Sequence, residues 1–278
     1  MSTTRKIFSF IGLPLLIVFA AVIVWAFQKS DTAAPNKEAG SSETSENSTE
    51  EVTKVTWSQS PNGWVPSSTP PECVDPFKIK TPTPSLSLAT SILYPGQERG
   101  DDYKPHGGFR FDNSSNEDIK VIMPMDASLV NASRYLSSGE VQILLTFISP
   151  CGISFRFDHA GDLVPDIQKI IEKLPEATEG DSRTTNISPQ LELKEGDLVA
   201  NSVGIKKNKN VFFDFGMYDL RKETGFRTTA AKFLSDHKGD DNALNGFCWF
   251  DYLPSEDSKL VKSLPASGAS GSTSDTCN

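Results

Sequence analysis

The stretch Lys104–Asp112 combines residue types that can do chemistry at the spacing of a β-strand. It reads Lys-Pro-His-Gly-Gly-Phe-Arg-Phe-Asp and holds one of the three histidines of the chain. Side chains two apart in a strand share a face, so His106, Arg110 and Asp112 are expected on one side and the two phenylalanines on the other, in a core. Gly108 permits a close approach of a ligand. The stretch therefore indicates a site, or alternatively the exposed polar face of a half-buried strand.

The segments that must position these residues read mainly as strands. Short strands at this spacing are typical of an antiparallel β-sandwich or barrel. The exception is Leu163–Leu174, where apolar residues recur at helical spacing up to Pro175, which predicts an amphipathic helix packed on the sheet as a lid. A second short helix is expected at Asp257–Leu264, another at Thr228–Leu234, and a polar loop at Glu176–Pro189. The expected strands are Leu86–Leu93, Gly108–Asp112, Ile119–Met123, Leu129–Ser133, Val141–Ile148, Ile153–Asp158, Leu191–Leu193, Leu198–Ala200, Val211–Tyr218 and Gly246–Leu253.

The first part of the chain predicts a membrane anchor and a stalk. Residues 7–27 carry no charge and are long enough to cross ~30 Å of hydrocarbon. Arg5 and Lys6 precede them, so residues 1–6 are expected in the cytoplasm and the rest outside, as in a single-pass protein of the cell membrane. A cleaved signal peptide is the alternative. Residues 28–70 are rich in Ser, Thr and Glu and predict a disordered stalk, followed by a β domain at 71–220 and a C-terminal extension at 221–278.

Charge and cysteine content narrow the class of protein further. The formal charge is −9 and there is no basic tract, which excludes nucleic acid as an expected partner. Four cysteines suit two disulfides in an exported domain, and three pairings are possible. We expect Cys248–Cys277, because a tail of small residues needs a tie, and hence Cys73–Cys151. No two cysteines are close enough in sequence for a zinc knuckle.

Five short motifs occur in the order seen in a known family. The chain resembles the lysostaphin-type (LytM-like) zinc metallopeptidases over roughly Leu86–Leu220. That resemblance implies an antiparallel duplicated hybrid motif domain, here with the amphipathic helix as an insertion after His159. The motifs are His106–Arg110 for the family's His-x-Gly-x-Asp, Val121–Val130 for its strand and turn, Phe157–Ala160 for its Tyr-x-His-Leu, Gly196–Val199 with Gly204 for its glycine turn, and Phe212–Phe215 for its His-Leu-His-Phe.

The departures from the family pattern bear on the cofactor. By position, the resemblance implies His106, Arg110 and Asp214 as metal ligands, with Phe212 and His159 as the assisting pair. Arginine has no lone pair for a metal, and phenylalanine cannot move a proton. No cofactor is therefore expected, and Arg110 and Asp214 are expected to form a bidentate ion pair in the former metal site. Alternatively, Arg110 extends to solvent.

Two functions follow from the resemblance. The first is a pseudoenzyme: a membrane-anchored, extracytoplasmic binding or regulatory module of the cell envelope, whose partner is a cell-envelope peptide or a surface protein. The alternative is an active zinc metalloendopeptidase of cell-surface peptides. Its rearranged ligands would come from His106, Asp112, His159 and Asp214, and His159 would be catalytic.

Overall fold

The computed structural model describes residues 54–61, 63–99, 102–221, 235–236, 238–268 and 274–277. The predicted segments 1–6 and 7–27, the first part of the stalk and the helix at Thr228–Leu234 lie outside this range. Among the residues that are described, no helix is long and apolar enough to span a bilayer.

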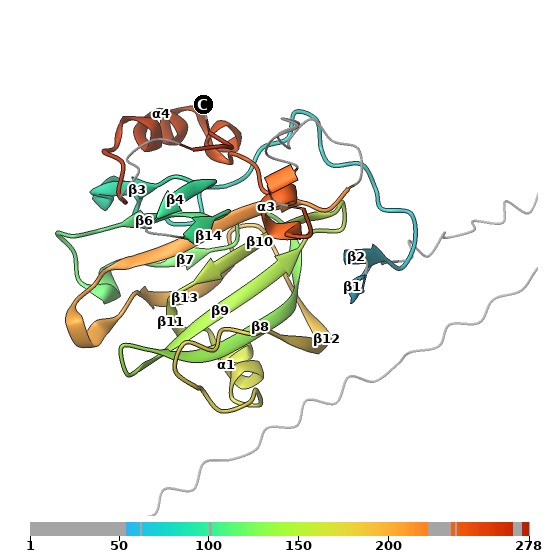
Figure 1. The fold of residues 1–278 in the computed structure, drawn as a ribbon, viewed down its shortest axis with the longest axis horizontal. Helices are drawn as coiled ribbons and strands as arrows, with labels where there is room; N and C mark the ends of the chain where they lie inside the picture. Colours follow the sequence, from blue (N-terminus) through green and yellow to red (C-terminus); the bar gives the residue numbers. More distant parts are fainter. Residues whose placement is uncertain are drawn as a thin grey trace, which may run out of the picture. The chain divides into compact units, whose positions relative to one another are not determined.

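A seven-stranded antiparallel sheet organises the domain, in the order β12-β8-β9-β10-β14-β6-β3 (Figure 1). A three-stranded sheet, β11-β13-β7, and the hairpins β1-β2 and β4-β5 accompany it. The prediction of a mainly β, antiparallel fold is confirmed. The strands are β1 (Trp57–Ser60), β2 (Gly63–Pro66), β3 (Ser91–Leu93), β4 (Gln97–Arg99), β5 (Asp102–Lys104), β6 (Gly107–Arg110), β7 (Val121–Ile122), β8 (Ala127–Ser137), β9 (Glu140–Ile148), β10 (Ile153–Asp158), β11 (Ala160–Leu163), β12 (Thr185–Leu193), β13 (Leu198–Val203) and β14 (Phe212–Asp219).

Short helices and turns lie outside the sheets. The predicted helix at Leu163–Leu174 is present as α1 (Pro165–Ile171), which buries Ile167 and Ile171. The helix expected at Asp257–Leu264 is α4 (Ser255–Ser263), and α3 covers Asp241–Asn245. The 3₁₀ turns are η1 (Leu86–Leu88), η2 (Asn116–Asp118), η3 (Lys206–Asn208) and η4 (Phe250–Tyr252).

Aromatic side chains fill one face of the large sheet. Period-two alternation directs them there, and the ring centroids of Phe109 and Phe213 are 5.2 Å apart. Full burial of each such ring stabilises the fold by roughly 1.5–3 kcal/mol. The expectation that Phe109 and Phe111 point into a core is confirmed. The fully buried phenylalanines on this face are Phe109, Phe111, Phe147, Phe155, Phe157, Phe213 and Phe215.

The predicted strand at Gly246–Leu253 is wrong. This segment makes one isolated bridge, between Gly246 and Tyr218, then runs irregularly into η4. It covers the aromatic face, where the ring centroids of Phe215 and Trp249 are 5.0 Å apart. Trp249 and its neighbour Phe250 are both buried. Two successive buried residues do not suit a strand with one solvent face, so the packing of this segment overrides its apolar content.

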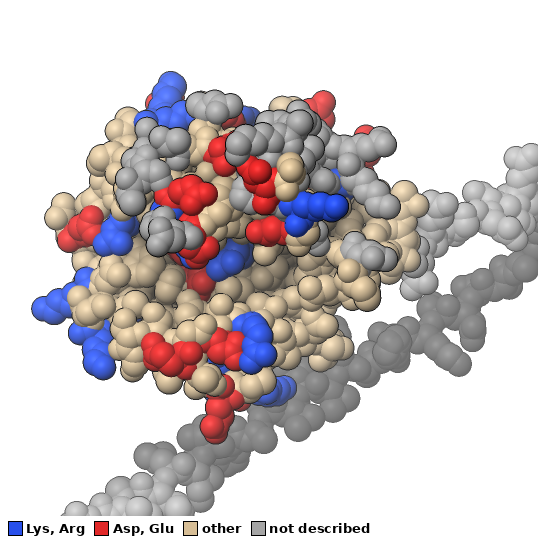
Figure 2. Space-filling model, in the orientation of Figure 1, with Lys and Arg blue, Asp and Glu red and all other residues tan. Residues whose placement is uncertain are grey.

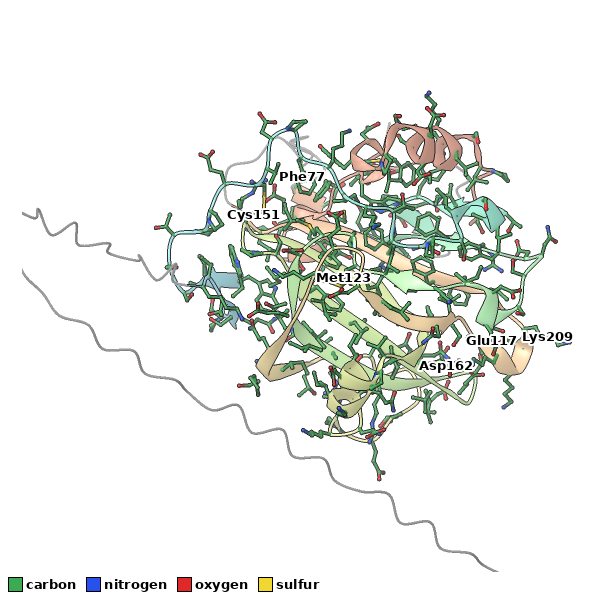
Figure 3. All side chains as sticks on the ribbon, turned by 180° about the vertical axis from the view of Figure 1, so that it is seen from behind. Phe77, Glu117, Met123, Cys151, Asp162 and Lys209 are labelled. Atoms are coloured by element: carbon green, nitrogen blue, oxygen red, sulfur yellow. A yellow bond between two sulfur atoms is a disulfide. The ribbon has the colours of Figure 1, made fainter. Side chains whose placement is uncertain are left out.

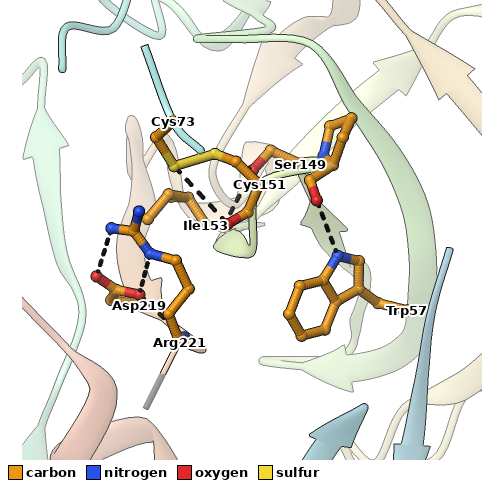
Figure 4. The surroundings of a disulfide bond; sticks show 8 residues. Trp57, Cys73, Ser149, Cys151, Ile153, Asp219 and Arg221 are labelled. Carbon is orange, nitrogen blue, oxygen red and sulfur yellow. Dashed lines mark hydrogen bonds and ion pairs between the residues drawn. A yellow bond between two sulfur atoms is a disulfide. The ribbon is translucent and has the colours of Figure 1, made fainter. Parts of the chain in front are cut away.

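The stalk does not extend to residue 70, as the composition predicted. From residue 57 to 66 the chain forms the hairpin β1-β2, with Trp57 only 4% exposed. The indole Nε1–H of Trp57 donates to the carbonyl of Pro150 at 3.4 Å, beside the disulfide Cys73–Cys151 (Figure 4). Both predicted disulfides are present, the second being Cys248–Cys277.

The C-terminal extension belongs to the same domain rather than to a separate part. Glu51–Asn278 form one compact unit, and Val261 of α4 contributes to the common core. The chain then runs beside β3: the N–H of Ile92 donates to Pro265 and the N–H of Ser267 donates to Ile92, at 3.0 and 2.8 Å.

At the other end of the large sheet, β12 is irregular. Its pairing with β8 shifts register between Asn186 and Leu191, and the strand contains Pro189. The three-stranded sheet is tied to its surroundings by Lys206, whose Nζ lies 2.9 Å from Glu117 and 2.6 Å from Asp162 of β11. Figure 3 labels these two acidic residues, which lie close together.

Candidate functional site

The second face of the large sheet carries charged side chains in cross-strand rows. Asp158 of β10 lies opposite Asp214 of β14, and Gly108 of β6 lies on the other side of Asp214. In the next row, Arg156 lies opposite Gly216. Like charges directly opposite each other destabilise a sheet, so the two carboxylates require compensating partners.

His106 is the partner of Asp214. Its Nε2 lies 3.0 Å from Asp214 Oδ2, and the two side chains are only 10% and 14% exposed. Glycine at 216 leaves room for the imidazole, because a Cβ there would meet His106 Cβ at 2.8 Å and Tyr218 Oη at 2.6 Å. At Gly108 a Cβ would lie 2.9 Å from Asp214 Oδ1. The two glycines therefore shape the pocket that holds the His106–Asp214 pair.

Burial sets the protonation states of this pair. Burial, with help from the positive Arg156, lowers the pKa of His106 despite the opposing effect of Asp214. Burial acts to raise the pKa of Asp214, but interactions with His106 and with Arg99 outweigh it and lower that pKa. The pair is thus a neutral imidazole that donates its Nε2–H to a carboxylate, while the buried His106 Nδ1 has no hydrogen-bond partner within the described part of the chain.

The lowered pKa of His106 predicts acid sensitivity. The unfolded state, with a His pKa of about 6.5, binds more protons than the folded state below that pH, so stability is lost as the pH falls through about 6.5. Asp214 acts with the same sign only below about pH 4. We expect the Tm to be a few degrees lower at pH 5 than at pH 7. His106→Gln, which keeps an N–H for Asp214, should reduce this difference, and His159→Gln should not. Equal Tm values at the two pH values would contradict the expectation.

A second cluster surrounds Asp158. Arg156 Nη2 donates to Asp158 Oδ2 at 2.9 Å, and the hydroxyl of Tyr135 donates to Asp158 Oδ1 at 2.8 Å. The backbone N–H of His159 donates to the same Oδ1 at 2.9 Å. Burial acts to lower the pKa of Arg156, but Tyr218 and the carboxylates raise it, so the guanidinium stays charged. This arginine therefore compensates the Asp158–Asp214 row.

Sequence reasoning missed Arg156, Asp158 and Tyr135. A signal was present, because the tripeptide Arg-Phe-Asp occurs at 110–112 and again at 156–158. Both copies place phenylalanine on the aromatic face and their charged residues on the polar face. The second copy is the more deeply buried one.

His159 and Phe212 contact each other. Their ring centroids are 4.4 Å apart, and His159 Nδ1 lies 2.9 Å from Gln142 Oε1. His159 has a φ of 65° at the end of β10, a left-handed conformation that is uncommon for a residue other than glycine. The turn aims its imidazole at Phe212.

The predicted ion pair between Arg110 and Asp214 is wrong. Arg110 Nη2 lies 3.0 Å from Asp112 Oδ1 and 2.9 Å from Asn210 Oδ1, and its guanidinium lies 5.7 Å from the ring of Phe212. The reason is strand register: Arg110 lies opposite Phe212, whereas Asp214 lies opposite Gly108, two residue pairs further along, where His106 reaches it. The Asp112 side chain is 52% exposed, and its carboxylate also accepts a hydrogen bond from the Thr90 hydroxyl.

One cavity of about 500 Å³ is lined by all five positions that the resemblance singles out. Figure 2 shows acidic and basic side chains close together around a hollow in the middle of the visible face. A zinc site needs three or four N, O or S ligands. Within the described ranges, no group of three or more His, Cys, Asp or Glu is placed to hold a metal ion, so the implied zinc set does not fit. The five positions are His106, Arg110, His159, Phe212 and Asp214.

Comparison of the chain with family models, curated proteins and solved structures finds no match in any of the three. The family resemblance therefore rests on the five motifs and remains a prediction.

Proposed function

We propose that this chain is a membrane-anchored, extracytoplasmic module that binds an extended peptide of the cell envelope on the polar face of the large sheet. The observation that carries the proposal is the cavity that joins the five motif positions. The charged groups of this cavity are held by partners within the fold. Arg110 and Phe212, however, occupy the positions where a peptidase would need a metal ligand and a proton carrier. Such a site suits recognition better than hydrolysis.

The shape of the polar face also supports a peptide. A second cavity of about 480 Å³ adjoins the first, because Arg156 and Ser182 line both. We treat the two adjoining cavities as one groove for an extended segment, which spans ~3.3 Å per residue. The exposed groups of the groove could pair with peptide N–H and C=O groups.

Binding of cell-envelope peptides tests the proposal. The full-length chain in detergent is titrated with tri- to pentapeptides released from cell-wall material, with and without added zinc. The masses of the peptides are then measured by mass spectrometry to detect cleavage. We expect saturable binding and intact peptides in both conditions. Arg110→Glu, at the cavity wall, should weaken binding by about tenfold, whereas Lys169→Glu on α1 should leave it unchanged.

Two results would contradict the module. Cleavage of the peptides together with about one equivalent of bound zinc would favour the alternative metalloendopeptidase. Absence of binding to any of the peptides would remove the proposed ligand class.

A further inference from the structure

The second cavity differs in chemistry from the first. Among the residues that the structure describes, no aspartate or glutamate lines it, although the full chain carries 36 of them. Most of its lining side chains are neutral amides and hydroxyls, and two aromatic residues, Trp64 of β2 and Tyr218 of β14, also line it. A cavity whose described lining is mostly hydrogen-bonding groups, with no carboxylate, does not suit an apolar ligand or a cation.

Three amide side chains reach this cavity from elements outside the large sheet. Gln59 comes from β1, and Asn242 and Asn245 come from α3, so they converge from distant parts of the sequence. Gln59 and Asn242 are exposed and Asn245 is partly buried, so all three amides are open to solvent or to a ligand. Among the residues that the structure describes, the buried Oδ1 of Asn131 has no hydrogen-bond partner. Buried polar atoms without partners are costly, which indicates that a ligand or water satisfies them.

The two arginines of the cavity do not make it an anion site. Arg156 is engaged with Asp158 at 2.9 Å. Arg183 holds Asp181 through two nitrogen atoms, its Nε at 2.7 Å from Oδ1. Each guanidinium is thus neutralised by a carboxylate of this chain, and the cavity offers hydrogen bonds rather than net charge.

From these contacts we propose that the second cavity is a subsite for a neutral saccharide. Amides both donate and accept, as the hydroxyls of a sugar ring do, and the Trp64 ring provides an apolar surface for a sugar face. The inference rests on the proposed function in that both cavities form one groove. The ligand of the whole groove would then be a peptide joined to a sugar.

Binding of free oligosaccharides tests this subsite. The full-length chain in detergent is titrated with cellotetraose and with the tetramer of N-acetylglucosamine, and binding is followed by calorimetry. We expect at least one of them to bind. The double variant Asn242→Ala/Asn245→Ala should weaken that binding by about tenfold or more, since each neutral hydrogen bond contributes a factor of roughly two to ten. Its Tm should match that of the parent chain, and the exposed Asn113→Ala serves as the matched control.

The outcomes separate this subsite from the peptide groove. Failure of both tetrasaccharides to bind, or binding that the double variant leaves unchanged, overturns the saccharide subsite. Saccharide binding that survives Arg110→Glu while no peptide binds supports the subsite and contradicts only the proposed peptide ligand.

Discussion

Replacing Arg156 by methionine is expected to lower the free energy of unfolding by about 3–5 kcal/mol. The guanidinium lies 2.9 Å from Asp158, whose side chain is almost wholly buried. Asp158 in turn faces Asp214 across the strands, and the positive charge of Arg156 acts on both carboxylates. Without it, two buried carboxylates share one row with too little compensation. Urea denaturation followed by circular dichroism measures the loss.

A second change identifies the cause of the loss. If the unpaired Asp158 carboxylate causes the loss, Arg156→Met combined with Asp158→Leu should recover part of the stability, because an apolar pair can replace a buried ion pair. The matched control is Arg183→Met, since Arg183 also pairs with an aspartate but is 89% exposed. A loss no larger for Arg156→Met than for this control would refute the argument.

Removal of the disulfide Cys73–Cys151 is the second change with a large expected effect. The bond closes a loop with a sequence separation of 78, and chain entropy assigns about 4–5 kcal/mol to a loop of that length. It fastens the segment after the hairpin β1-β2 to the turn between β9 and β10. The variant Cys73→Ala/Cys151→Ala should therefore be much less stable than the oxidised parent in urea.

The other disulfide provides the comparison. Cys248–Cys277 has a sequence separation of 29, so its removal should cost about 3–4 kcal/mol, less than removal of the first. Adding a reductant should destabilise the parent chain by the contribution of both disulfides. It should destabilise each variant that retains one disulfide only by the contribution of that bond. Equal stability of the oxidised parent and of Cys73→Ala/Cys151→Ala would contradict the expectation.

Local pattern was sufficient to predict most of the strands and the core face. Alternation in Gly-Phe-Arg-Phe placed Phe109 and Phe111 correctly, because a strand with one buried face has a strict period of two. The disulfide pairing was also predictable, since a tail of small residues has little reason to carry Cys277 unless the tail is tied down. The predicted end of the stalk at residue 70 was wrong, because the prediction followed the polar composition. It neglected Trp57 and Trp64, which pack in the hairpin β1-β2.

Partner choice within the site was not predictable. Arg110 and Asp214 share a sheet face, but a step of two residue pairs along β6 and β14 brings Arg110 to Asp112 and Asn210 and brings Asp214 to His106. That step depends on register and on the space left at Gly216. Both are set by contacts between segments far apart in the sequence, which a motif does not encode.

The two ends of the large sheet bear on how the protein behaves at high concentration. An outer strand offers unpaired N–H and C=O groups as a template for aggregation. Here the C-terminal segment at Pro265–Ser267 occupies hydrogen-bonding groups of β3, and the disulfide of Cys277 anchors the chain that follows. At the opposite edge, Pro189 and the shifted register of β12 interrupt the regular row that another chain would need. The tail of small residues thus helps to keep neighbouring copies from joining edge to edge.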